Sequence, residues 1–258
     1  MRLLFIRHGE PDYDHDTLTK KGWREANLFA DMAMKMDLGT MYRSPLGRAM
    51  DTASCTMKKT ETDASIHDWL REFHAFVDIN DSPELQYAFA DCHKEGDRYP
   101  LHYIVWDMLP GYLAAHPEYM DPVRWRETEV ARHGDLVERY DEVEKIFLEL
   151  LSRHGYHKEK GYFRVEKESE ETLTFFCHFG ITCVMLAILW DVSPFFLWHY
   201  LVMAPSSLTE LVTEEREEGI AIFRAKRIGD TSHLALGNEP ASFAARFCET
   251  YHNFDQRH

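Results

Sequence analysis

The chain is poor in cysteine, with five among 258 residues, an odd number at widely separated positions. No two of them form a C-x-x-C pair, and no cluster of His, Cys and carboxylate residues has the spacing of a metal site. A disulfide framework is therefore excluded, and free thiols of this kind are typical of a reducing compartment. The cysteines are Cys55, Cys92, Cys177, Cys183 and Cys248.

Basic residues are also in short supply, with 29 Lys and Arg against 44 Asp and Glu, a formal net charge of −15. A field of this sign repels polyanions, so we expect neither nucleic acid nor an anionic membrane surface as a partner. A small anionic substrate stays compatible with this charge if positive side chains converge locally.

The sequence has no secretory signal that we can identify, because no basic segment followed by an apolar run stands at its start. We therefore expect a cytoplasmic protein. One stretch, 173–190, is strongly apolar, but it carries His178 and Gly180 near its middle and is followed by Asp191. A buried strand and a core helix explain this stretch better than a membrane span.

The clearest positive signal is the apolar segment 3–6, which is followed by Arg7, His8, Gly9 and Glu10. Apolar residues without alternation predict a strand covered on both faces, as in a parallel sheet, and such sheets bind ligands beyond the carboxyl ends of their strands. Arginine grips phosphate and histidine can act as a nucleophile, while glycine allows a ligand to approach closely. A strand that ends in two solvated polar residues would have the same sequence, so this segment alone does not establish a ligand-binding site.

The same layout returns later in the chain. Residues 173–177 predict a second buried strand, which is followed by His178 and by a helix over 181–190. Consecutive strand–helix units usually lie side by side, so we expect His8 and His178 to converge. Two histidines and nearby arginines would form a small positive pocket that suits a phosphoryl group.

Two further predicted strands, at 41–42 and 66–70, also end in polar residues. After the first, we expect a helix with Ser44 as N-cap and the following proline as its first residue. Arg48 would then lie in the first turns, close to the strand ends. Glu72 follows the second of these strands.

Several segments resemble, in order, the motifs of the histidine phosphatase superfamily, in its phosphoglycerate mutase-like branch. The residues Arg7, His8 and Gly9 after an apolar strand are similar to its R-H-G signature. That signature alone is a weak signal, but the ordered set is a strong one and covers nearly the whole chain apart from the segment at about 75–126. The other segments are 18–22 (L-T-x-x-G), 44–53 (S-P-L-x-R-A-x-x-T-A), 70–72 (L-x-E), 178–180 (the second H-G element) and 228–234 (similar to N-D-T-S-H-L).

The resemblance implies a metal-independent phosphatase, without a cofactor, that hydrolyses a small phosphomonoester through a phosphohistidine. His8 would attack phosphorus, and water would hydrolyse the intermediate. Arg7, Arg48 and His178 would neutralise the phosphoryl oxygens. Glu72, protonated near the working pH, would give its proton to the leaving oxygen.

We therefore expect one α/β domain over 1–258, a three-layer α/β/α sandwich with a mostly parallel central sheet. The helical and strand periodicity disappears at about 75–126, a segment rich in aromatic residues, His and Pro. We interpret it as an inserted, largely helical cap; a loosely helical structural excursion is the alternative. The remaining predicted elements are a helix over 130–151, a strand over 161–165 beside the one at 173–177, a strand pair over 208–213 and 220–226, and a last helix over 241–252.

The chain departs from the mutase pattern R-H-G-E-S-x-W-N at Asp14, which replaces a neutral amide near the phosphate and weakens a mutase interpretation. Phe179 would narrow the pocket, and the glycine usual after Glu72 is missing. These departures indicate that the cap, and with it the substrate, differs from that of the mutases. The residues expected to contact the substrate are Arg7, Gly9, Asp14, Arg48, His178 and Phe179.

Two other functions stay open on the sequence. One is a cofactor-dependent, phosphoglycerate mutase-type phosphotransferase, and the other is a phospho-ligand binder that has lost turnover. The aromatic residues of the insertion would suit an apolar or ring-bearing alcohol, pack a core of their own, or form a homodimer surface.

Overall fold

The structure, a computed structural model, describes residues 1–73, 76–90, 92–101, 103–242 and 250–252. The chain divides into two compact units, which are described separately below. The predicted insertion at 75–126 falls within the second unit, and its role as a cap stays a prediction. The first unit comprises Met1–Glu72, Leu151–Thr182 and Val202–His258, and the second comprises Phe73–Leu150 and Cys183–Leu201.

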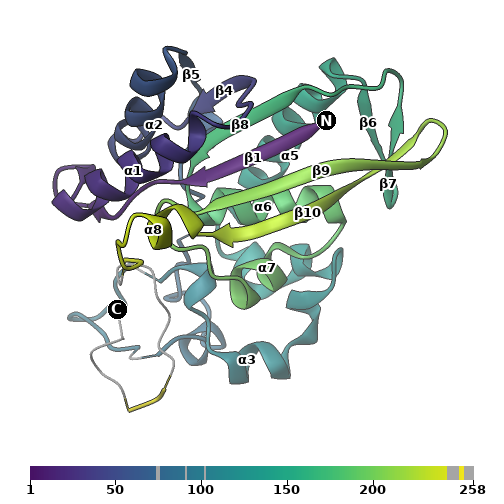
Figure 1. Ribbon diagram of the computed structural model, residues 1–258. Coiled ribbons are helices and arrows are strands. Elements are labelled where there is room, and N and C mark those ends of the chain that lie inside the picture. Colours follow the sequence, from purple (N-terminus) through teal and green to yellow (C-terminus); the bar gives the residue numbers. More distant parts are fainter. Residues whose placement is uncertain (74–75, 91, 102, 243–249, 253–258) are drawn as a thin grey trace. The chain divides into compact units, whose positions relative to one another are not determined.

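A sheet of eight strands forms the centre of the first unit, as far as its residues are described, in the order β5-β4-β8-β1-β9-β10-β7-β6 (Figure 1). The strands from β5 to β1 are parallel, and those from β1 to β6 are antiparallel. The predicted α/β class with a central sheet is confirmed. The bounds are β1 Arg2–Arg7, β4 Thr40–Arg43, β5 Ala64–Ile66, β6 Tyr156–Glu159, β7 Tyr162–Val165, β8 Thr172–Cys177, β9 Leu208–Glu217 and β10 Ile220–Asp230.

The two strands that carry the histidines are neighbours. β1 pairs with β8 in parallel, in a register that sets Arg7 opposite Cys177. Residues 3–6 and all of β8 are buried, which explains why their sequences are apolar without alternation. Because the strands end at the same level, His8 and His178 leave the sheet side by side.

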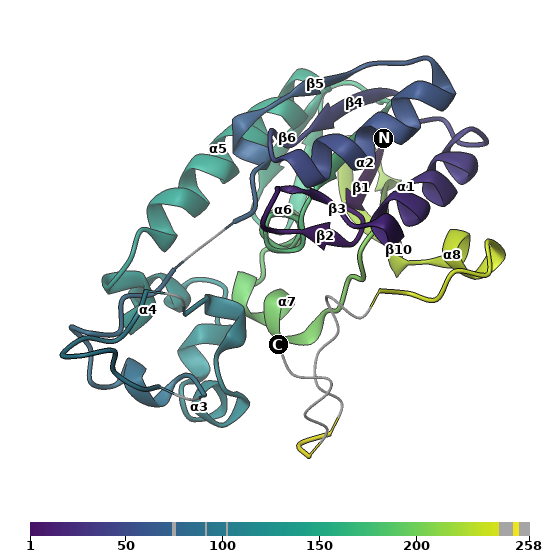
Figure 2. The ribbon, with the colours of Figure 1, turned by 90° about the vertical axis from the view of Figure 1, so that its left-hand side faces the viewer.

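Two helices of the first unit, α1 (Lys20–Ala33) and α2 (Gly47–Thr60), lie next to each other (Figure 2). α1 begins at Thr19, whose hydroxyl accepts the Gly22 N–H at 3.0 Å. The prediction that α2 begins at Ser44 is wrong, since Leu46 is its N-cap. The Ser44 hydroxyl accepts the Leu46 N–H at 3.2 Å in the turn before the helix, and His178 holds it from the other side.

Two strand predictions also need correction. The strand expected over 66–70 ends at Ile66, because the Arg71 N–H turns back to the Asp68 carbonyl at 3.1 Å and closes a 3-10 turn. The strand at β7 pairs with β6 and β10, whereas a pairing with β8 was expected. Gly161, at φ +82°, lets the chain reverse into the β6–β7 hairpin. Of the last predicted helix, 243–249 lie outside the described residues.

The second unit is built mainly from helices and buries aromatic side chains in a core of its own. Trp125 is 1% exposed and packs edge-on against Tyr140, with ring centroids 4.9 Å apart. Phe195 contacts Tyr119 and Trp198 with centroids 5.0 and 5.3 Å away. Core packing therefore accounts for the buried aromatic residues of the insertion. The helices that lie wholly in this unit are α3 (Pro110–Ala115), α4 (Glu129–Arg132) and α7 (Pro194–Tyr200).

The remaining helices are α5 (Leu136–Arg153), α6 (Phe179–Trp190) and α8 (Ser232–Leu236). α6 follows β8 directly, so the apolar stretch 173–190 is the strand and core helix that were predicted. No helix in the described part of the chain is both long and apolar enough to cross a bilayer.

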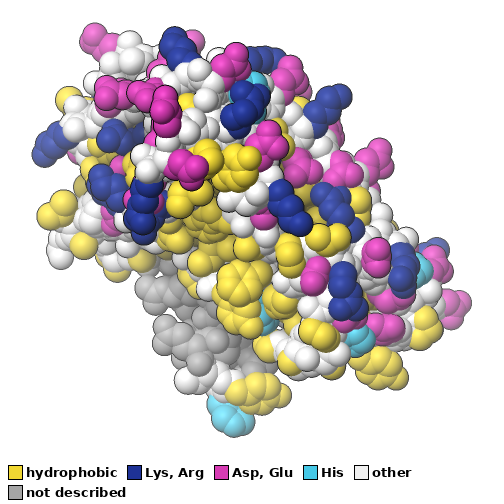
Figure 3. Space-filling model, turned by 90° about the vertical axis from the view of Figure 1, so that its right-hand side faces the viewer, with side chains coloured by type: hydrophobic (Ala, Val, Ile, Leu, Met, Phe, Trp, Pro, Cys, Tyr) yellow, Lys and Arg dark blue, Asp and Glu magenta, His cyan; other side chains and the backbone are white. Residues whose placement is uncertain are grey.

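Charged side chains on the β9–β10 hairpin form pairs of opposite sign. Glu214 lies 2.9 Å from Arg216 and 2.8 Å from Arg224, and Glu210 lies 2.9 Å from Arg227. Figure 3 shows acidic and basic side chains intermixed over one face of the molecule. The surplus of acidic residues is therefore not gathered into one patch on that face.

Candidate active site

His8 and His178 are in contact at the ends of β1 and β8. Their ring centroids are 5.1 Å apart, and both are buried, at 1% and 0% exposure. The His8 N–H donates to the Cys177 carbonyl at 3.0 Å, which continues the strand pairing one residue beyond β1. The structure thus brings together the two histidines that the sequence singled out.

The neutral tautomer of His8 is set by its own loop. His8 Nδ1 lies 2.8 Å from the Gly9 carbonyl, which can only accept, so Nδ1 carries the hydrogen and Nε2 keeps the lone pair. Burial lowers the pKa of His8 well below its ordinary 6.5, and the charges of Arg7 and Arg48 lower it further. A neutral imidazole with a free Nε2 lone pair is the form that can attack phosphorus.

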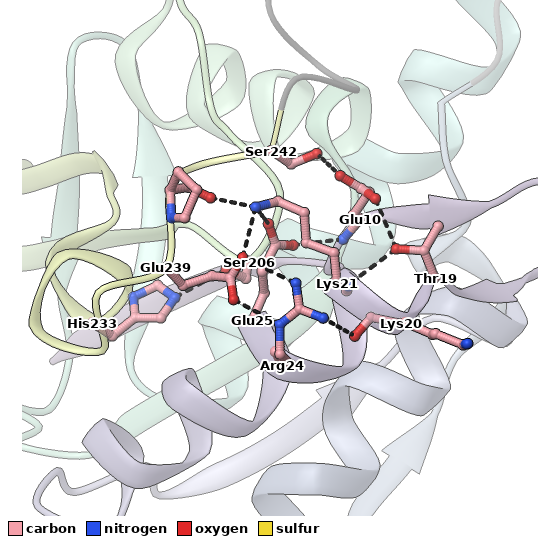
Figure 4. A network of polar contacts seen from close by, with 12 residues as sticks. Glu10, Thr19, Lys20, Lys21, Arg24, Glu25, Ser206, His233, Glu239 and Ser242 are labelled. Carbon is pink, nitrogen blue, oxygen red and sulfur yellow. Dashed lines mark hydrogen bonds and ion pairs between the residues drawn. The ribbon is translucent and has the colours of Figure 1, made fainter.

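The main chain of His8 is held by residues that the sequence reading missed. The Ser206 N–H donates to the His8 carbonyl at 2.9 Å, from a left-handed conformation at φ +59°. The Ser206 hydroxyl lies 2.9 Å from Nε2 of His233 (Figure 4). The His233 ring packs edge-on against Phe29. Burial lowers the pKa of His233 to about 4, so this ring is neutral. The motif at 228–234 contains His233, but nothing in the sequence pointed to Ser206.

Gly9 and Gly22 allow the loop after β1 to approach α1 closely. A Cβ on Gly9 would lie 2.7 Å from the Gly22 carbonyl oxygen, and one on Gly22 would lie 2.2 Å from the Glu10 carbonyl oxygen. The Gly9 N–H donates to the hydroxyl of Thr52 at 3.0 Å, and that hydroxyl donates to the Arg48 carbonyl at 2.8 Å. Gly9 therefore lets the backbone at Gly22 come close to the loop. The predicted contact of Gly9 with substrate stays a prediction.

The two predicted arginines are held differently. Arg7 donates from Nη1 to the Met203 carbonyl, and its Cζ lies 5.7 Å from the centroid of the Phe179 ring, which is 5% exposed. Phe179 therefore supports the guanidinium by a cation–π contact. Arg48 is 7% exposed, and its Nη1 donates to Asp16 at 2.8 Å. Asp14, the predicted substrate contact, is exposed and lies with Asp16 in the hairpin turn between β2 (Pro11–Asp12) and β3 (Thr17–Leu18).

His178 and Glu72 are fixed by the elements that flank them. His178 Nε2 lies 2.8 Å from the Ser44 hydroxyl, and the Ser44 N–H donates to the Phe176 carbonyl at 2.9 Å. Glu72 accepts the N–H of Ile181 at 3.1 Å, in the first turn of the helix that follows His178. Burial raises the pKa of Cys177 to about 12, and the negative charge of Glu72 adds to this rise, which places the carboxylate near the end of β8.

A second layer of polar residues lies behind the loop after β1 (Figure 4). The fully buried Glu25 accepts the Glu10 N–H at 2.8 Å, and the Glu10 carboxylate accepts from Thr19 at 2.8 Å. Lys21 lies 4.0 Å from Glu25 and 2.8 Å from Glu239. Burial raises the pKa of Glu25 from 4.5 to about 7, despite the contacts with Glu10 N–H and Lys21.

The raised pKa of Glu25 predicts a fall in stability with rising pH. Between pH 4.5 and about 7 the folded state still holds this proton while the unfolded state has lost it, so stability decreases across this window and levels off above it. The component is about 3 kcal/mol. In Glu25→Gln we expect this pH-dependent component to vanish, because glutamine does not titrate. The amide oxygen can still accept the Glu10 N–H, so the local structure is retained.

The measurement is the free energy of unfolding in urea at pH 5, 6, 7 and 8, for the wild type and for Glu25→Gln. The difference between the two proteins cancels the contributions of titrating groups that both contain. Glu142→Gln, at an exposed position on α5, is the control. A difference that does not change with pH would contradict a buried, titrating Glu25.

The arrangement offers a candidate nucleophile, His8, with Arg7 and His178 at the ends of β1 and β8, Arg48 at the start of α2, and the Glu72 carboxylate after the 3-10 turn that follows β5. Over the described ranges, no group of three or more His, Cys, Asp or Glu side chains is placed to hold a metal ion. Residues of these types can carry out phosphoryl transfer to histidine.

Comparisons with known proteins agree with this fold. No curated protein matches the chain. Among solved structures, a mutant phosphoserine phosphatase from Entamoeba histolytica with bound phosphoserine has a TM-score of 0.54 and 16% identity, over 90% of this chain and 98% of that one. A mycobacterial glucosyl-3-phosphoglycerate phosphatase with VO3 has a TM-score of 0.52 and 19% identity, over 88% and 98%. Both likenesses show the fold.

A family model matches the first part of the sequence. Residues 3–90 match the family model described as the histidine phosphatase superfamily (branch 1), a segment that contains Arg7, His8, Arg48 and Glu72. His178 lies beyond the matched segment and joins the site through the pairing of β8 with β1. Residues 3–90, about a third of the chain, are thus similar to the histidine phosphatase superfamily (branch 1).

Proposed function

We propose that this protein is a phosphomonoesterase that hydrolyses a small phosphorylated substrate through a phosphohistidine on His8. The observation that carries the proposal is the state of His8, which is buried, neutral and hydrogen-bonded through Nδ1, beside His178 and within the field of Arg7 and Arg48. These are the properties that a nitrogen nucleophile for phosphorus requires.

The reaction proceeds in two steps. The Nε2 lone pair of His8 forms a bond to phosphorus while the bond to the alcohol oxygen breaks, and Glu72 gives that oxygen its proton. Water then attacks phosphorus and returns a proton to Glu72, the P–N bond breaks, and inorganic phosphate and neutral His8 result. Arg7, Arg48 and His178 stabilise the charge on the equatorial oxygens in both steps.

The substrate class that we propose rests on the solved structures with the same fold. The solved relatives named above act on phosphoserine and on glucosyl-3-phosphoglycerate, so a small phosphorylated metabolite is the class we propose. We propose that the insertion at 75–126 selects among such alcohols as a cap. The free thiols of Cys55, Cys92 and Cys177 support a cytoplasmic location, which we propose.

The test is the hydrolysis of an aryl phosphate by the full chain in EDTA, with and without vanadate. EDTA-resistant, vanadate-sensitive release of phosphate supports the proposal. Turnover that EDTA abolishes would contradict it, and a folded protein that binds vanadate without turnover would be a phospho-ligand binder. Transfer of phosphate to an added hydroxy acid, faster than release to water, would identify a mutase instead.

A further inference from the structure

We propose that Asp16 is a positioning residue for Arg48 in the phosphate site, an inference that rests on the proposed phosphatase activity. The Asp16 carboxylate bridges two donors at the start of α2. Oδ2 accepts the Gly47 N–H at 2.7 Å, and Oδ1 accepts Nη1 of Arg48 at 2.8 Å. No motif in the sequence points to this aspartate, because its contacts join residues that are 31 and 32 positions apart.

The backbone on both sides is shaped for this contact. Asp16 lies at the tip of the hairpin between β2 (Pro11–Asp12) and β3 (Thr17–Leu18), at φ +47°. Non-glycine residues seldom adopt this left-handed conformation, although aspartate tolerates it better than most. A Cβ on Gly47 would lie 1.9 Å from the Asp16 carbonyl oxygen, so only glycine allows the hairpin to come so near. Strain concentrated at one contact points to a function for that contact.

The guanidinium of Arg48 is held by only part of its donor set. Nη1 is engaged by Asp16, whereas Nε is buried without a hydrogen-bond partner among the residues the structure describes. The aromatic ring of Tyr13 covers the guanidinium, with its centroid 5.4 Å from Cζ. A buried donor of this kind fits a phosphoryl oxygen, which accepts charge-assisted hydrogen bonds from arginine.

Asp16 and the phosphoryl group can therefore bind the same guanidinium at once. Asp16 takes Nη1 from the hairpin, where its side chain is 45% exposed, and leaves Nε for the substrate. The contrasting possibility is that the carboxylate occupies the phosphate position and competes with it. The two possibilities predict opposite changes in phosphate affinity when Asp16 is removed. Removing a positioning residue weakens phosphate binding, whereas removing a competitor strengthens it.

The experiment measures binding of inorganic phosphate by calorimetry and kcat/KM for an aryl phosphate in the full chain. For Asp16→Ala we expect both to fall about 10- to 100-fold, by analogy with the loss when a residue that orients a metal ligand is removed. Asp16→Asn keeps one acceptor oxygen and should lose less. Asp31→Ala removes another ion pair with α2, that to Lys59 at 2.6 Å, and is expected to leave both quantities unchanged.

A double substitution separates positioning from a general effect on the hairpin. In an Arg48→Ala background, Asp16→Ala is expected to add no further loss, since Asp16 acts through Arg48. An equal loss in both backgrounds, an unchanged affinity or a tighter binding of phosphate would each overturn the proposal. Thermal unfolding verifies the fold, and Asp16→Asn carries the test if the alanine variant is unfolded.

The binding measurement also keeps the two proposals apart. If the wild type binds phosphate but hydrolyses no ester, the phosphatase proposal fails while the effect of Asp16 on phosphate affinity is still decided. If the wild type hydrolyses the ester and Asp16→Ala does so equally well, only the role of Asp16 fails.

Discussion

Replacing His8 by alanine is expected to lower kcat/KM for an aryl phosphate by on the order of 10⁵-fold or more, the scale of loss when an enzyme's nucleophile is removed. The contacts that fix the strand end are made by main-chain atoms. The His8 N–H binds the Cys177 carbonyl and the His8 carbonyl accepts the Ser206 N–H, so alanine keeps both. The fold should therefore survive, and the loss should lie in kcat.

The intermediate gives a second readout for His8. With a ³²P-labelled substrate and an alkaline quench, which preserves phosphohistidine, the wild type should carry label in the steady state and His8→Ala should carry none. His157→Ala, on β6, is the matched control, because its ring also makes a polar contact, with Glu166 at 2.6 Å, but is assigned no part in the reaction. Label that persists in His8→Ala, or turnover within tenfold of the wild type, would rule out His8 as the nucleophile.

The two histidine-bearing strands were predictable because their signal is local. A short apolar run without alternation can only be a strand buried on both faces or a piece of core helix, and polar residues directly after it mark a strand end. The register that sets Arg7 opposite Cys177 then follows from the sheet and brings His8 to His178. What the sequence leaves open is which strands are neighbours, and the family resemblance and the structure supply that.

The support behind these residues could not be predicted, since it depends on contacts between distant segments. Ser206 reaches His8 across nearly two hundred residues, and its hydroxyl meets His233. Asp16 reaches Arg48 only because Gly47 lets a hairpin tip approach α2. Ser44 was expected as a helix cap, yet its hydroxyl lies between the Leu46 N–H and His178. Sequence propensities predict a turn at Ser44, but they do not predict its contact with the distant His178.

Replacing Glu72 by glutamine is expected to have an effect that depends on the leaving group. Loss of a general acid should lower kcat/KM for an alkyl phosphate by about 10²- to 10⁴-fold, because an alkoxide is a poor leaving group without a proton. A nitrophenyl phosphate, whose phenolate leaves without protonation, should lose less than about tenfold. The amide oxygen can still accept the Ile181 N–H, so position and fold are retained.

The slope of log kcat/KM against the pKa of the leaving alcohol therefore carries the test. We expect this slope to be shallow in the wild type, where a proton compensates for a basic alcohol, and steep in Glu72→Gln. Glu171→Gln, a glutamate 63% exposed and paired with His154, should leave the slope unchanged. A uniform loss across the series would give Glu72 a purely structural role at the first turn of α6. No loss at all would mean that another group protonates the alcohol, and the two-step scheme would keep His8 but need a different acid.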